Sequence, residues 1–213
     1  MTIVPAILTD NFDEFKKQLG RLENIFPLIQ IDVADGKFVS GKTFDEIEKI
    51  KDLKTPAEFE IHLMTTDPLA EMEKWAEIKN VKRVIFHIEA GDPTRAINFA
   101  RGKCWQVGLA LNPETSLTAV EPYYKLVEEM LFLTVHPGKQ GAKFLPEVGK
   151  KIQQFNNETM KQSPARPLCA VDGGINADNI AEIKSWGAEI FYVGSALTRA
   201  KNIEDALKKL INA

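Results

Sequence analysis

Short apolar runs alternate with longer segments in which apolar residues recur every three or four positions, and this pattern repeats eight times along the chain. The short runs are nearly continuous in apolar residues, which is typical of strands buried on both faces of a parallel sheet covered by helices. The expected strands are Ile3–Leu8, Leu28–Val33, Glu58–Met64, Arg83–Glu89, Gln106–Asn112, Met130–His136, Leu168–Asp172 and Ile190–Gly194.

The segments between the expected strands have the periodicity of amphipathic helices. Phe12, Phe15, Leu19 and Leu22 fall on one helical stripe, and the last helix is expected to begin near Asn202. Strict alternation of strand and helix predicts a parallel sheet with right-handed crossovers. Eight such units in 213 residues predict an α/β fold of the (β/α)8 or TIM-barrel type, with the whole chain, residues 1–213, as one domain.

An open doubly wound sheet is the alternative fold for this alternation. Such a sheet usually carries a glycine-rich turn directly after its first strand. Here the first expected strand is followed by Thr9 and Asp10, with no glycine. The barrel is therefore the preferred interpretation.

Composition and charge exclude several classes of protein. Hydrophobic residues make up 44% and charged residues 27%, the formal net charge is -3, and no basic block occurs, so no nucleic-acid partner is expected. No apolar run approaches the roughly 20 residues that span a bilayer, and the first residues do not resemble a signal peptide. Cys104 and Cys169 are far apart and are expected to stay reduced. We therefore expect a cytoplasmic protein without a membrane partner.

Polar side chains gather at the carboxyl ends of the expected strands, where barrels of this type have their active sites. Asp32, His62 and Asp172 end the second, third and seventh strands, and Gln30 points to the same side of its strand as Asp32. A carboxylate inside a largely apolar barrel is costly unless it is paired, metal-bound or neutralised. Each aspartate alone could equally cap a helix or end a loop. His87 fits a hydrogen-bonded core histidine as well as a functional one.

Glycine-rich segments follow the last three expected strands. They contain Gly138 and Gly141, then Gly173 and Gly174, and finally Gly194 with Ser195. Glycine lets the backbone approach a ligand closely, and consecutive N–H groups bind anions. Because the loops after strands seven and eight are the habitual phosphate site of this fold, a phosphorylated ligand is expected.

A series of motifs resembles the ribulose-phosphate 3-epimerase family in order and over essentially the whole chain. The motifs are Pro5–Leu8, Asp32–Gly36, His62–Met64, His87–Ala90, Leu111–Thr115, Val171–Ile175 and Gly194–Ala196. The resemblance implies an isomerase of the pentose phosphate pathway that interconverts D-ribulose 5-phosphate and D-xylulose 5-phosphate. It implies a small phosphorylated sugar as the ligand, and it is compatible with a homo-oligomer.

The resemblance also implies roles for individual residues. Asp32 and Asp172 match the two aspartates that act as acid and base on opposite faces of the sugar. One divalent metal ion (zinc, iron, manganese or cobalt) is implied, with His62, Asp32 and Asp172 as ligands and Gln30 as a doubtful fourth. The positions implied to bind substrate and phosphate are His62, Gly138, Gly141, Gly173, Gly174, Gly194 and Ser195.

Several departures from the family pattern gather at the same mouth. Gln30 stands where the family has its other metal histidine, and an amide oxygen is a poorer zinc ligand than imidazole nitrogen. Ala6 replaces a serine, and Ala34 and Leu133 replace methionines. Three of the four implied ligands remain, so Gln30 leaves open whether the implied cation binds with a different metal preference, binds weakly or does not bind. A related barrel enzyme for another phosphorylated sugar and a non-catalytic sugar-phosphate binder remain alternatives.

Overall fold

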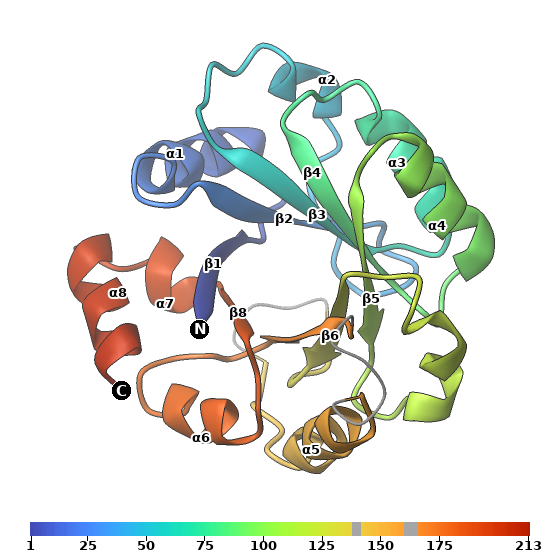
Figure 1. Cartoon of the computed structure of the whole chain (residues 1–213). Coiled ribbons are helices and arrows are strands. Elements are labelled where there is room, and N and C mark those ends of the chain that lie inside the picture. Colours follow the sequence, from blue (N-terminus) through green and yellow to red (C-terminus); the bar gives the residue numbers. More distant parts are fainter. Residues whose placement is uncertain (138–141, 160–165) are drawn as a thin grey trace.

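The computed structural model describes residues 1–137, 142–159 and 166–213. Within these residues, eight parallel strands follow one another in chain order around a closed barrel (Figure 1). The strands are β1 (Thr2–Ile7), β2 (Leu28–Ala34), β3 (Glu58–Met64), β4 (Val81–His87), β5 (Gln106–Leu111), β6 (Glu129–Leu133), β7 (Leu168–Asp172) and β8 (Ile190–Val193). β1 pairs with both β2 and β8, so the predicted barrel is confirmed and the open sheet is excluded.

Helices surround the barrel on its outer side (Figure 1). They are α1 (Phe12–Leu22), α2 (Ile47–Ile50), α3 (Pro68–Trp75), α4 (Pro93–Gly102), α5 (Val148–Thr159), α6 (Ile180–Ser185), α7 (Ser195–Thr198) and α8 (Ile203–Asn212). Two short 3-10 turns, Leu117–Ala119 and Glu121–Tyr123, connect β5 to β6. In the described part of the chain, no helix is long and apolar enough to cross a membrane.

Local sequence signals determine where the helices begin. The side chain of Asn11 caps α1 by accepting a hydrogen bond from the backbone N–H of Glu14 at 2.9 Å. Asn202 caps α8 in the same way, accepting from the backbone N–H of Asp205 at 3.1 Å, as its position predicts. Leu19 and Leu22 are buried on the inner face of α1.

The alternation of side chains along the strands separates two cores. On β2, Ile29 and Ile31 belong to the large apolar core between barrel and helices. The intervening Gln30 and Asp32 face the barrel interior, where they contact each other. The inward positions therefore supply a polar mouth above a small apolar layer, which includes Ile85 and Leu131.

The opposite end of the interior holds a buried charge network. Nη1 of Arg83 donates to Oε2 of Glu60 at 2.9 Å and also to a carboxylate oxygen of Glu129. The hydroxyl of Tyr192 donates to the other oxygen of Glu129 at 2.7 Å. This network closes the barrel floor and lies apart from the strand ends that form the mouth.

Candidate active site

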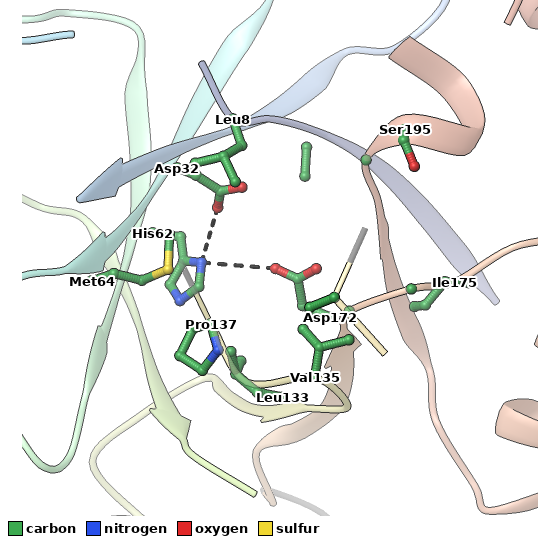
Figure 2. Close-up of a pocket in the computed structure, with 15 residues that line it drawn as sticks. Leu8, Asp32, His62, Met64, Leu133, Val135, Pro137, Asp172, Ile175 and Ser195 are labelled. Carbon is green, nitrogen blue, oxygen red and sulfur yellow. Dashed lines mark hydrogen bonds and ion pairs between the residues drawn. The ribbon is translucent and has the colours of Figure 1, made fainter. Parts of the chain in front are cut away.

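The predicted residues Asp32, His62 and Asp172 line one pocket at the carboxyl ends of the strands (Figure 2). Strand register explains part of this arrangement, because Asp32 on β2 is directly opposite His62 on β3. Asp172 reaches the same pocket from β7, on the other side of the barrel. Gly173, Gly174, Gly194 and Ser195 also line the pocket, as their positions in the sequence predict.

His62 lies between the two aspartates (Figure 2). Its Nδ1 is 3.0 Å from Oδ1 of Asp32 and 3.8 Å from Oδ2 of Asp172. One ring nitrogen of His62 and one oxygen of each carboxylate therefore lie within 4.8 Å of one another. Two anionic groups and an imidazole this close need a positive charge between them, supplied by a proton or by a cation.

Gln30, two residues before Asp32 on β2, belongs to the same cluster. Its Nε2 donates to Oδ1 of Asp32 at 2.9 Å and to Oδ2 of Asp172 at 3.2 Å. Its buried Oε1 has no hydrogen-bond partner within the described part of the chain. A buried amide oxygen is seldom left without a partner, so the orientation of this amide is set by the contacts of its nitrogen with the two carboxylates.

The electrostatics of the cluster favour proton binding by Asp172 and by His62. Burial and the negative charge of Asp32 raise the pKa of Asp172 to about 7. Burial opposes a charge on His62, but the hydrogen bond and negative charge of Asp32 outweigh it and raise the pKa of His62. A pKa near 7 lets Asp172 both hold and release a proton near neutral pH, which suits acid–base catalysis.

A divalent cation fits this donor set. Asp32, His62 and Asp172 supply three ligand atoms at mutual distances compatible with one ion. Gln30 presents its donor nitrogen to the carboxylates, but the two ends of a side-chain amide exchange by rotation. In the rotated form Oε1 of Gln30 would face the two aspartates and could be an oxygen ligand of the ion.

The glycines after β7 bring the backbone close to the pocket. Gly173 and Gly174 have positive φ angles of 121° and 67°, which strain other residues. A Cβ atom on Gly173 would lie 2.7 Å from a side-chain carbon of Val135, so no larger residue fits there. The hydroxyl of Thr134 donates to the backbone oxygens of Asp172 and Gly173, which holds this turn in place. Gly138 and Gly141 lie outside the described residues.

A series of polar contacts runs from His62 through His87 to Glu89, and the sequence does not predict it. Nε2 of His62 lies 3.2 Å from Nε2 of His87, and Nδ1 of His87 lies 3.3 Å from Oε2 of Glu89. His87 could only be described as a core or functional histidine, because its contact with His62 depends on β3 and β4 being neighbours. His136 is exposed and pairs with Glu114 instead.

The chain resembles known proteins in sequence and in fold. Residues 2–198 match the model of the "Ribulose-phosphate 3 epimerase family". The ribulose-phosphate 3-epimerase of Buchnera aphidicola subsp. Baizongia pistaciae is 32% identical over 93% of this chain and 89% of its own length. The Schizosaccharomyces pombe enzyme of the same name is 29% identical over 99% of this chain and 92% of its own length.

Solved structures share the barrel at lower identity. A 3-hexulose-6-phosphate synthase has a TM-score of 0.69 and 19% identity, covering 99% of this chain and 98% of its own. KGPDC from Streptococcus mutans, in complex with D-R5P, has a TM-score of 0.70 and 12% identity, covering 99% of this chain and 95% of its own. At these identities the likeness concerns the fold alone.

Proposed function

The chain belongs to the ribulose-phosphate 3-epimerase family and is an epimerase acting on a sugar phosphate, and we propose that it interconverts D-ribulose 5-phosphate and D-xylulose 5-phosphate. The observation that carries this proposal is the approach of Asp32, on β2, and Asp172, on β7, to His62. Epimerisation at a carbon beside a carbonyl needs one group to remove a proton and another to return one to the opposite face.

The two aspartates perform these steps in our proposal. Asp32 removes the proton from C3 of ribulose 5-phosphate as a carboxylate, and the electron pair moves toward the neighbouring carbonyl oxygen. Asp172, whose pKa is raised to about 7 by burial and by the charge of Asp32, donates a proton to C3 from the other side. After one turnover Asp32 is protonated and Asp172 ionised, which is the starting state for the reverse reaction.

His62 and the aspartates would hold a divalent cation, with the amide oxygen of Gln30 as a fourth ligand after rotation. When bound, such a cation supplies a positive charge that stabilises the negative oxygen of the deprotonated sugar. Three of these four ligand atoms would be oxygens. Oxygen-rich sites suit manganese better than zinc, which favours nitrogen and sulfur ligands, so we propose manganese or iron before zinc.

The phosphate group would bind on the glycine side of the pocket. Gly173, Gly174, Gly194 and Ser195 lie together there, and backbone N–H groups at such turns attract anions. This placement directs the sugar carbons toward the aspartates. We further propose that residues 1–213 act as one domain, because β1 and β8 pair to close the barrel. Both cysteines are free thiols, which is in keeping with a cytoplasmic enzyme.

The test is an assay of ribulose 5-phosphate conversion by purified protein that is first freed of metal and then supplied with manganese, iron, cobalt or zinc. We expect formation of xylulose 5-phosphate, fastest with manganese or iron. A parallel panel of other ketose and aldose phosphates tests the substrate, since Ala6 removes a polar contact from the pocket wall. Turnover of another sugar phosphate alone, or binding without any turnover, would reject the proposal.

A further inference from the structure

We propose that Thr134 is a positioning residue that directs the backbone N–H of Gly174 toward the phosphate group of the substrate. It acts through the peptide bond between Gly173 and Gly174, which directly follows β7. The use of this N–H for a sugar phosphate rests on the proposed function, but its direction and its affinity for an anion do not.

The hydroxyl of Thr134 has one proton for two nearby backbone oxygens. Thr134 is buried directly after β6, and its Oγ1 lies 3.0 Å from the oxygen of Asp172 and 2.6 Å from that of Gly173. The oxygen of Asp172 already accepts from the backbone N–H of Thr134 at 2.7 Å. The hydroxyl proton therefore belongs to the shorter contact, with the oxygen of Gly173, which has no other donor in the described part of the chain.

The peptide bond between Gly173 and Gly174 needs such a contact to keep one orientation. Both residues have positive φ angles, and neither has a Cβ atom that would restrict the rotation of the peptide between them. In a trans peptide the C=O and N–H bonds point in opposite directions. By fixing the carbonyl of Gly173, Thr134 therefore also fixes the direction of the N–H of Gly174.

The order of the strands gives that direction. β7 lies between β6 and β8 in the barrel. Because the carbonyl of Gly173 points toward Thr134, on the β6 side, the N–H of Gly174 points toward the β8 side. Gly194 and Ser195, directly after β8, line the same pocket as Gly174. The N–H is thus directed at the space between the turns that follow β7 and β8.

This N–H is open to a ligand. Gly174 is exposed, and its N–H has no hydrogen-bond partner among the residues that the structure describes. Ser195 lies on the side of Asp172 that faces away from His62 (Figure 2). A phosphate at this end of the pocket would accept a charge-assisted hydrogen bond from Gly174 while the sugar carbons extend toward Asp172.

The other side of Gly174 is held independently. Its carbonyl oxygen accepts from Nδ2 of Asn176 at 3.1 Å and from Nδ2 of Asn179 at 3.0 Å. Two side chains therefore hold the carbonyl of Gly174, whereas the hydroxyl of Thr134 alone holds that of Gly173. Thr134 is thus the position at which one substitution should release the N–H.

The contact of Thr134 with Asp172 separates binding from chemistry. The backbone N–H of Thr134 donates to the oxygen of Asp172 at 2.7 Å, and this bond does not depend on the side chain of Thr134. Removing the hydroxyl should therefore weaken the grip on phosphate while the backbone of Asp172 stays in place. We expect KM to rise and kcat to change little.

Thr134→Val is the sharpest variant because it replaces the hydroxyl by a methyl group of similar size. Thr134→Ser keeps the hydroxyl and should behave like the parent. Thr159→Val is the matched control, because Thr159 is also buried and its hydroxyl donates to the backbone oxygen of Phe155 at 2.8 Å, within α5. Thermal unfolding of both valine variants separates a loss of stability from a loss of phosphate binding.

The experiment is NMR of protein labelled with glycine that carries nitrogen-15 and a carbon-13 carbonyl. Gly174 is the only glycine that follows another glycine in the sequence, so its amide alone is bonded to a labelled carbonyl and is assigned directly. Its signal is followed during titration with inorganic phosphate, which needs no turnover. We expect it to shift in the parent, in Thr134→Ser and in Thr159→Val with equal affinity. Thr134→Val should bind phosphate at least about tenfold more weakly, as for the loss of one hydrogen bond to a charged group.

Kinetics with ribulose 5-phosphate complete the test. Thr134→Val should raise KM by a similar factor with little change in kcat, and Thr134→Ser should restore KM. A parent protein whose Gly174 amide does not respond to phosphate, or a Thr134→Val protein with the parent's phosphate affinity, would overturn the proposal. Turnover of a different sugar phosphate would contradict the proposed function, but the phosphate titration would still decide the role of Thr134.

Discussion

The side-chain amide of Gln30 donates a 2.9 Å hydrogen bond to Asp32. The same nitrogen lies 3.2 Å from Asp172, so one amide connects carboxylates on β2 and β7, which are not neighbours in the barrel. An ionised carboxylate can accept hydrogen bonds but cannot donate them, and two ionised carboxylates at one point repel each other. The position that the family resemblance associates with a metal-binding histidine therefore holds a neutral donor that links the two candidate catalytic groups.

Replacing either aspartate by asparagine should nearly abolish epimerisation. The substitutions Asp32→Asn and Asp172→Asn keep the size of the side chain, but an amide cannot exchange a proton with C3. We expect kcat to fall about 10²–10⁴-fold in each, which is the usual contribution of a general acid or base. Binding of inorganic phosphate, measured by calorimetry, should change little. Asp178→Asn, at an exposed loop position, is the control, and comparable kcat values in all three variants would contradict the assignment.

Gln30→His should increase metal affinity. An imidazole nitrogen is a better ligand than an amide oxygen for borderline metals, so the gain should be larger for zinc and cobalt than for manganese. The change also removes the amide donor to Asp32 and Asp172. Metal content after purification and affinities from competition with a chelator measure the effect. An unchanged zinc affinity would show that Gln30 does not border the cation.

The architecture and much of the site could be predicted from the sequence because their signals are local. Each strand is a short apolar run, and Asp32, His62 and Asp172 each stand at the end of one. Closure of the barrel places all strand ends at one mouth, whatever the details of packing. Chain order and strand alternation were therefore enough to bring these three residues together.

The contacts among these side chains could not be predicted. They depend on where individual atoms lie in the folded structure and not on the positions of the residues in the sequence. The amide of Gln30 reaches Asp172 across 142 positions of sequence, and its orientation is chosen by the charges it meets. The line from His62 to Glu89 depends on the register of β3 against β4 and on a loop held by Lys151. No spacing within one segment carries that information.

The buried carboxyl of Glu60 should make stability decrease as the pH rises. Burial and the negative charge of Glu129 raise the pKa of Glu60 from 4.5 to about 8, despite the nearby Arg83. Between these values the folded protein keeps a proton that the unfolded chain releases. The stabilisation is therefore complete below about pH 4.5 and is lost progressively toward pH 8, with a slope of at most about 1.4 kcal/mol per pH unit from this group.

Glu60→Gln should remove this contribution, because the amide stays neutral and its oxygen can still accept from Arg83. Urea unfolding at several pH values between 5 and 8 should show a flatter dependence than in the parent protein, after allowance for the other titrating groups. Glu58→Gln, an exposed position on the same strand, should leave the slope unchanged. Equal slopes in Glu60→Gln and the parent would mean that Glu60 is already ionised in the fold.

Two glycines in helices should respond to alanine in opposite directions. A Cβ on Gly149, in α5, would lie 2.5 Å from Cε2 of Trp186, whose ring is stacked on Phe144 with 5.9 Å between centroids. Alanine there must displace the indole, and overpacking of this kind typically costs about 1–3 kcal/mol. A Cβ on Gly20, in α1, would meet no atom within 4 Å.

Gly20→Ala should therefore stabilise the protein by about 0.5–1 kcal/mol, the usual advantage of alanine within a helix. Gly149→Ala, in the first turn of α5, also replaces a helical glycine, so a loss of stability in this variant reports the contact with Trp186. Because about 1 kcal/mol shifts the midpoint of a chain this size by roughly 2–4 °C, thermal unfolding resolves both effects. The intrinsic fluorescence of the three tryptophans, one of which is Trp186, should also change only in Gly149→Ala. If both substitutions stabilise equally, α5 can move away from the indole at no cost, and Gly149 is not required for its packing.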